Sequence, residues 1–263
     1  RLSGAQRPNR AKVASAKRGP VASPPMFNRE LIPQRRRDRV RSKFYDVAGP
    51  AVRWSWDLYK SLGAIGPNSA AGRAFGSLGE GSIVCFPYDT LMNTDSIHIG
   101  SGTMISGHVA LSAGWGPKHP GISPRIVVIG DRCLIGRGSS VVGHKYIEIG
   151  DDVWTGHNVH ITDMNHGYEN LDLPISVQNQ PEAPVHIGSG SWLGHNTVVL
   201  PGVTIGRHVV VGAGSIVTSD LPDYSVAVGS PARVIRRYEP GDGWKSVGPH
   251  AVTASLASIT LRS

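Results

Sequence analysis

The stretch from 184 to 217 reads PVHIGSGSWLGHNTVVLPGVTIGRHVVVGAGSIV, and it repeats with a period of six residues. An aliphatic side chain occupies every sixth position, and a glycine follows four of these six positions. The aliphatic positions are Ile187, Leu193, Val199, Ile205, Val211 and Val217. A helix repeats near 3.6 residues and a simple strand near 2, so this spacing fits neither. A period of six predicts short strands with one inward aliphatic side chain, separated by tight corners where glycine, Asn or Asp takes a positive φ.

Three earlier blocks carry the same spacing. Their apolar or β-branched positions are Ile99, Ile105 and Leu111, then Ile129, Ile135 and Val141, then Ile149, Thr155 and Ile161. Three such sides close a triangular coil, and successive coils stack through a backbone ladder with a spacing of about 4.8 Å. We therefore expect an all-β fold, a parallel β-helix over residues 95–238. Two loops interrupt it, at 114–125 and at 163–183.

The net charge of +8 is unevenly distributed along the chain. Residues 1–43 hold 13 Lys or Arg against Glu30 and Asp38, and the remaining residues hold 14 basic against 17 acidic residues. The basic segment contains several prolines and few apolar residues, which predicts a disordered arm that can contact an anionic membrane surface or an acidic partner. No zinc-finger, helix-turn-helix or RNA-binding motif accompanies the charge, so we expect no sequence-specific binding of nucleic acid.

The segment 44–94 does not follow the period of six. It contains apolar residues at helical spacing, namely Ala51, Trp54, Leu58 and Leu62. They predict a short amphipathic helix that packs as a cap on the open end of the prism. Residues 239–263 carry no clear signal, and we expect them to form a C-terminal tail.

The sequence has no feature of export or of a disulfide-rich domain. No stretch holds the roughly 18 uncharged apolar residues that span a bilayer, and the first residues do not read as a signal peptide. Cys85 and Cys133, which lack metal-site spacing, predict two buried free thiols. Together these features predict a cytoplasmic protein, with peripheral attachment at the inner membrane surface as an open alternative.

The segment 184–238 resembles the C-terminal half of the hexapeptide-repeat acyltransferases, especially the sugar O-acetyltransferase branch that includes maltose and galactoside acetyltransferases. The resemblance covers about residues 95–238. It implies a left-handed parallel β-helix assembled as a homotrimer, with acetyl-CoA or another acyl-CoA bound between neighbouring prisms. The handedness comes from the resemblance alone, because parallel crossovers are normally right-handed.

The segment TDMNHGYE at 162–169 resembles the histidine-bearing loop of that family. The resemblance makes His166 the expected general base, because a hydroxyl attacks a thioester well only as its proton is removed, and imidazole titrates near the working pH. A carboxylate is expected to orient this imidazole. The nearby candidates are Asp163, Glu169 and Glu182, and the sequence does not rank them.

We expect the acceptor to be contacted by further residues around His166, namely His144, Asn165 and Tyr168. His144 falls one coil before the histidine-bearing loop, so it either faces the same cleft or occupies a solvent-facing corner. Related transferases place an acceptor-contacting Asn in this neighbourhood, whereas this chain has GRGSS at 136–140. That departure leaves the sugar specificity open.

The resemblance also assigns the coenzyme-binding residues. In the family, the pantetheine arm lies between prisms along the GSIVT rung and beside the corner after the WIG segment, while basic residues near the C-terminus meet the phosphates. The corresponding residues here are His195, Ala213, Thr218, Ser219, Arg233 and Arg236, with Trp192 placed to stack on adenine or on a neighbouring subunit. Ser219 stands where relatives commonly have lysine, which removes one cation from the phosphate site.

Other chemistries have little support in the sequence. His157, His160 and His195 lack the spacing of the zinc ligands in the γ-class carbonic anhydrases, which share the prism, so we expect no metal. Walker, GxSxG and GxGxxG motifs do not occur. The expected activity is transfer of an acyl group, most simply acetyl, from CoA to a hydroxyl of a sugar, polysaccharide or glycolipid. The alternatives are N-acetylation of an amino sugar or another amine, and a non-catalytic β-helix scaffold.

Overall fold

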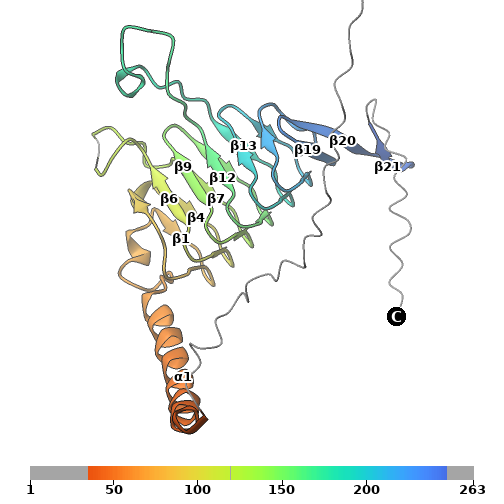
Figure 1. Cartoon of the computed structure of the whole chain (residues 1–263). Coiled ribbons are helices and arrows are strands. Elements are labelled where there is room, and N and C mark those ends of the chain that lie inside the picture. The colour runs from red at the N-terminus through yellow and green to blue at the C-terminus, as the bar shows by residue number, and fades with distance from the viewer. Residues whose placement is uncertain (1–34, 119, 248–263) are drawn as a thin grey trace, which may run out of the picture. The chain divides into compact units, whose positions relative to one another are not determined.

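The computed structural model describes residues 35–118 and 120–247, with side chains from residue 45 onward, and most of them form a three-sided prism of short strands (Figure 1). The first sheet contains β1 (Ser77–Leu78), β4 (Ile97–Ile99), β7 (Val127–Ile129), β10 (Ile147–Ile149), β13 (Val185–Ile187) and β16 (Thr204–Ile205). The second contains β2 (Ile83–Val84), β5 (Met104–Ile105), β8 (Leu134–Ile135), β11 (Trp154–Thr155), β14 (Trp192–Leu193), β17 (Val210–Val211), β19 (Ser225–Gly229), β20 (Ala232–Glu239) and β21 (Gly243–Ser246). The third contains β3 (Leu91–Met92), β6 (Ala110–Ala113), β9 (Ser140–Gly143), β12 (His160–Thr162), β15 (Val198–Val199) and β18 (Ile216–Val217).

Each turn of the chain visits the three sheets in the same order, so a strand pairs in parallel with the strand one coil later. Ile149 on β10, for example, pairs with Ile129 on β7 and with Ile187 on β13. All the positions that the period of six predicts to point inward are buried, and the aliphatic ones form one continuous core. The predicted left-handed parallel β-helix is confirmed.

The corners also follow the period of six. Gly190, Asn196, Gly202, His208 and Gly214 lie six residues apart, and all five have a positive φ. Glycine and Asn were expected at such corners, but His208 was not. The left-handed conformation costs a residue with a Cβ only about 1–2 kcal/mol, so the packing of the rungs can impose it on a histidine.

The prism begins one coil earlier than the expected start at residue 95. Strands β1, β2 and β3 pair in parallel with β4, β5 and β6, and Val84 is fully buried in the core. Leu78 and Val84 keep the spacing of six, but the next inward residue, Leu91, follows after seven. This longer corner hides the first coil from a search for a strict period.

Helix α1 (Arg35–Gly63) is longer than the expected short helix, and it begins within the segment 1–43 for which the sequence predicts disorder. That prediction is wrong for 35–43, where five arginines favour a helix, whereas residues 1–34 lie outside the described residues. Trp54, Leu58 and Leu62 are exposed rather than packed as a cap. In the described part of the chain, no helix is both long enough and apolar enough to cross a membrane.

The second sheet ends in an antiparallel extension. Strand β20 pairs with β19 and with β21, and β21 falls within the segment 239–263 that was expected to be a tail. Residues 248–263 lie outside the described residues. Outside the sheets, three short 3₁₀-helices are described, at Gly72–Ala74, Thr94–Ser96 and Ile175–Val177.

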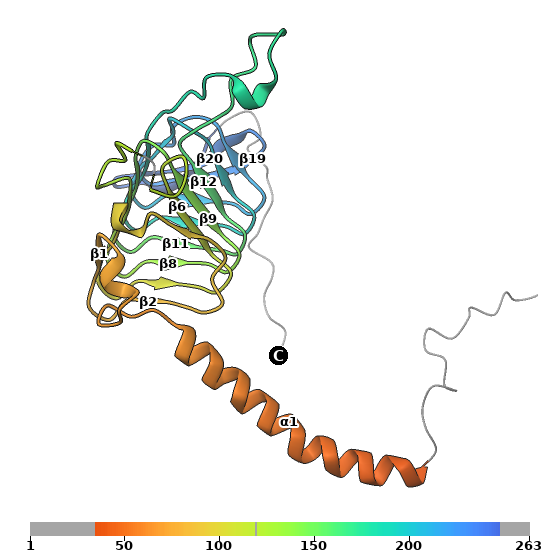
Figure 2. The same ribbon diagram turned by 90° about the vertical axis from the view of Figure 1, so that its left-hand side faces the viewer.

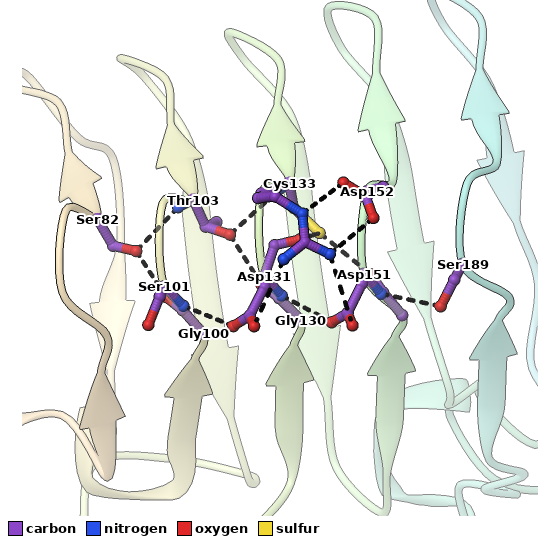
Figure 3. Close-up of polar contacts among 12 residues, drawn as sticks. Ser82, Gly100, Ser101, Thr103, Gly130, Asp131, Cys133, Asp151, Asp152 and Ser189 are labelled. Atoms are coloured by element: carbon purple, nitrogen blue, oxygen red, sulfur yellow. Dashed lines mark hydrogen bonds and ion pairs between the residues drawn. The ribbon is translucent and has the colours of Figure 1, made fainter.

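One corner of the prism is held by hydrogen bonds that run from coil to coil (Figure 3). The carboxylate of Asp131 accepts from the backbone N–H of Ser101 at 2.7 Å, and Asp151 accepts in the same way from Asp131 at 2.8 Å. Arg132 donates two hydrogen bonds of 2.8 Å to Asp152, which lowers the pKa of that carboxyl. The acidic side chains at this corner therefore have partners within the prism.

We expect Gly136→Ala to destabilise the prism. A Cβ at this position would collide with the backbone carbonyl of Gly156 on the next coil, and a backbone ladder cannot yield as a side chain can. The free energy of unfolding should fall by about 1–3 kcal/mol, measured by denaturant titration. Gly116→Ala is the matched control, because a Cβ there meets no atom within 4 Å. Equal stability of the two variants would contradict the packing argument.

Candidate active site

Both long loops leave the prism at one corner, where strands of the third sheet end (Figures 1 and 2). The loop 114–125 follows β6, the turn 144–146 follows β9, and the loop 163–183 follows β12. Because β6, β9 and β12 are neighbours in the third sheet, the three segments leave from consecutive coils. The corner therefore brings together residues that are far apart in the sequence.

Asp163 is the buried anchor of this corner. Its side chain is fully buried, and its two oxygens accept hydrogen bonds of 2.7–2.8 Å from the backbone N–H groups of His144, Lys145 and Tyr146. A carboxylate that satisfies three backbone donors fixes the conformation of the turn. Asp163 thus sets the position of His144, and its predicted role in orienting His166 stays a prediction.

His144 lies between the two loops. Its ring packs 4.1 Å from the ring of Trp115, and only 9% of its side chain is exposed. Its Nδ1 lies 3.9 Å from Glu182 Oε1 and has no hydrogen-bond partner within the described residues. Burial lowers the pKa of His144, and the nearby His166 lowers it further, while Asp163 and Glu182 oppose the shift. The Nδ1 of His144 is therefore a buried polar atom that faces the Glu182 carboxylate without a hydrogen bond to it.

The lowered pKa of His144 makes stability depend on pH. Below about pH 6.5 the unfolded chain binds a proton that the folded chain resists, so the stability present above this pH is lost as the pH falls toward the folded pKa. The melting temperature should therefore drop more between about pH 7.5 and pH 5.5 for the wild type than for His144→Gln. His208→Gln, which alters an exposed histidine at the corner before β17, should behave as the wild type. An equal drop in all three proteins would contradict this role for His144.

His166 is exposed on the loop that begins at Asp163. The two arms of this loop pair through the backbone, because Asn165 N–H donates to Pro181 at 3.0 Å and Gly167 N–H donates to Asn179 at 2.9 Å. Gly167 is required here, since a Cβ would collide with the Asn179 carbonyl. The paired arms hold His166 on a defined backbone while leaving its imidazole accessible.

The other residues predicted on this loop have less defined surroundings. Asn165, Tyr168 and Glu169 are all exposed. Glu169 accepts a hydrogen bond of 3.0 Å from the backbone N–H of Tyr168, and Glu182 lies 3.9 Å from His144 Nδ1. The choice among the carboxylates as partner of His166 stays open.

The residues predicted on the coenzyme side lie on later coils. Trp192 projects from β14 with 49% of its surface exposed, between Trp154 and Val210 on the neighbouring strands. His195 follows β14, and its Nδ1 accepts a hydrogen bond of 2.9 Å from the backbone N–H of His157. The remaining coenzyme-side residues are exposed, and they are Ala213, Thr218, Ser219, Arg233 and Arg236.

The third sheet separates the two groups within one chain. His195 and Ala213 lie at the corners where the chain enters this sheet, before β15 and β18. His144 and His166 lie where the chain leaves it, after β9 and β12. Within one chain, the width of the third sheet therefore separates His166, the predicted base, from His195 and Ala213. Thr218 and Ser219 follow β18 and share the exit edge with His166.

Trp115 is a residue of the candidate site that the sequence did not indicate. The sequence marks the loop 114–125 only as an interruption of the period of six, whereas the structure packs its tryptophan on His144. The only signal was an aromatic residue in a Gly- and Pro-rich loop. Among the described residues, no group of three or more His, Cys, Asp or Glu side chains could hold a metal ion.

Residues 184–219 match the bacterial transferase hexapeptide family (six repeats), and residues 126–163 match the hexapeptide repeat of succinyl-transferase. WbbJ of Escherichia coli (strain K12), named as a lipopolysaccharide biosynthesis O-acetyl transferase, is 31% identical over 163 residues. That alignment covers 59% of this chain and 79% of WbbJ. The chain belongs to the hexapeptide-repeat transferases.

This hexapeptide-repeat transferase is 40% identical over 130 residues to Rv3034c of Mycobacterium tuberculosis, named as an acetyltransferase. The alignment covers 49% of this chain, which spans 43% of the length of Rv3034c. Among solved structures, a mutant of the N-acyltransferase AntD from Bacillus cereus, in complex with dTDP-4-amino-4,6-dideoxyglucose and coenzyme A, superposes with a TM-score of 0.57 at 21% identity. The match covers 67% of this chain and 92% of AntD, and it shows a common fold.

Proposed function

We propose that this hexapeptide-repeat transferase moves an acyl group, most simply acetyl, from coenzyme A to a hydroxyl of a sugar or glycan. The observation that carries the proposal is the corner where the exposed His166 stands near His144, whose side chain is only 9% exposed. The likeness to WbbJ, named as an O-acetyl transferase, favours a hydroxyl acceptor. Solved structures with this fold contain coenzyme A, which favours a thioester donor.

In the proposed reaction, the imidazole of His166 removes the proton of the acceptor hydroxyl as the oxygen attacks the thioester carbonyl. The new C–O bond forms, the C–S bond breaks, and the imidazolium returns its proton to the departing thiolate. Backbone N–H groups of the loop or rung would stabilise the negative charge on the carbonyl oxygen. The rings of His144 and Trp115, which pack 4.1 Å apart, would line the acceptor site beside His166.

The donor side of the proposal requires a neighbouring copy. The outer face of the second sheet carries adjacent apolar residues along one register column, and they are Met104, Leu134, Trp154, Trp192 and Val210. Such a column supports a homotrimer in which His195 and Ala213 of one chain face His166 of the next. Arg233 and Arg236 would then meet the phosphates of the coenzyme.

The test uses acetyl-CoA with a panel of glycosides and amino sugars, and it measures release of the CoA thiol. An acceptor that raises thiol release yields a product for treatment with mild alkali, which cleaves an ester but leaves an amide. A product that mild alkali cleaves supports O-acetylation, and a product that resists alkali indicates N-acetylation instead. Binding of acetyl-CoA without thiol release for any acceptor would support a non-catalytic scaffold.

A further inference from the structure

The second half of helix α1 carries an exposed apolar stripe, made up of Val47, Ala51, Trp54, Leu58 and Leu62. These residues recur at intervals of three or four, so they lie along one side of the helix. Trp54 is 68% exposed and Leu62 is 76% exposed. A single exposed apolar residue needs no explanation, but a row of large ones on one helix marks an interaction surface.

Another side of the same helix is charged, while Val52, Trp56 and Tyr59, which lie outside the stripe, are also exposed. Arg53, Asp57 and Lys60 recur at intervals of four and three, and Asp57 pairs with Lys60 at 2.7 Å. Tyr59 packs edge-on against Phe86 with the ring centroids 5.1 Å apart. The end of α1 is therefore held by a residue that does not belong to the stripe. The stripe is therefore not needed to fix the end of the helix.

The charge of the first half of α1 decides between two kinds of partner. Positions 35–43 contain six basic residues and only Asp38 as an acidic one. In a cyclic oligomer, equivalent helices that met through the stripe would bring these like charges together, which opposes association. An anionic lipid surface attracts the same charges, and Trp and Leu are residues that enter the interfacial region of a bilayer.

We propose that α1 binds an anionic membrane surface, lying in the plane of the interface with the stripe inserted among the lipids. The two signals, an apolar stripe and an adjacent basic segment, are together the combination that gives stable peripheral attachment. This inference rests on α1 alone and is independent of the proposed acyl transfer.

The experiment is flotation of the full chain with vesicles of phosphatidylcholine alone and with vesicles containing about 30% phosphatidylglycerol. We expect binding to the anionic vesicles at least about tenfold stronger than to the neutral ones, and a marked loss of binding between about 0.1 M and 0.5 M salt. Absence of binding to anionic vesicles, or equal binding to both kinds, would overturn the proposal.

The variant for this test replaces Trp54, Leu58 and Leu62 with serine. It should bind anionic vesicles at least about tenfold more weakly, while the charge-neutral control Asp57→Ser with Lys60→Ser keeps its binding. Light scattering of each protein gives its mass without vesicles. A stripe variant that binds vesicles as well as the control, or that forms a smaller oligomer, would overturn the proposal, and the second result would assign the stripe to contacts between copies.

Discussion

We expect His166→Ala to lower kcat at least about 100-fold and to leave the Kd for acetyl-CoA within about threefold of the wild-type value. The reason is that the variant keeps the prism and the proposed coenzyme side but loses the imidazole that we propose takes the acceptor proton. The first quantity comes from thiol release with the best acceptor of the panel, and the second from calorimetry.

The matched control for this variant is His208→Ala. His208 is also an exposed histidine, but it lies at the corner between β16 in the first sheet and β17 in the second, away from the loop corner. Its substitution should leave kcat unchanged. Full activity of His166→Ala would remove this residue from the mechanism, and a parallel loss of coenzyme binding would make its role structural.

A mixture of two inactive variants should recover activity if each site lies between two chains. The first variant is His166→Ala, and the second is Ala213→Phe, which blocks the coenzyme side and leaves the apolar column of the second sheet unchanged. Each alone should retain about 1% of the wild-type activity or less. In randomly mixed trimers, half of the chains supply an intact base and half of their neighbours supply an intact coenzyme side, so about one quarter of the sites are complete.

The measurement is thiol release by trimers assembled from the co-expressed variants, compared with trimers of each variant alone. Recovery toward about 25% of the wild-type rate supports sites shared between chains. A mixture as inactive as its parents would show that both halves of the site belong to one chain. The separation of His166 from His195 by the third sheet is the structural reason for expecting recovery.

The prism could be predicted because its inward positions recur every six residues and depend only on local spacing. Ile149, Leu193 and Val211 are buried as the period requires. The first coil escaped prediction because the corner between Val84 and Leu91 holds one residue more than the period allows. The extent of α1 escaped because its basic first half has the composition of a disordered arm while keeping good helix propensity.

For the proposed site, the sequence indicates only those residues that a single loop carries. The loop sequence indicated His166 as a candidate base. For His144 the sequence left two positions open, the same cleft or a solvent-facing corner, and in the structure His144 lies near His166. The anchoring of the turn by Asp163 and the packing of Trp115 on His144 depend on which corners stack on consecutive coils. That register is a property of the folded prism, and a local pattern does not contain it.

The most direct test of the account is calorimetric titration of the purified chain with free CoA, acetyl-CoA and octanoyl-CoA, with the mass of the same sample measured by light scattering. We expect a trimer that binds one CoA compound per chain. The acyl-CoA that binds with the lower Kd is then the donor to use in the acceptor screen. A well-folded trimer that binds none of the three would contradict acyl transfer and favour a scaffold.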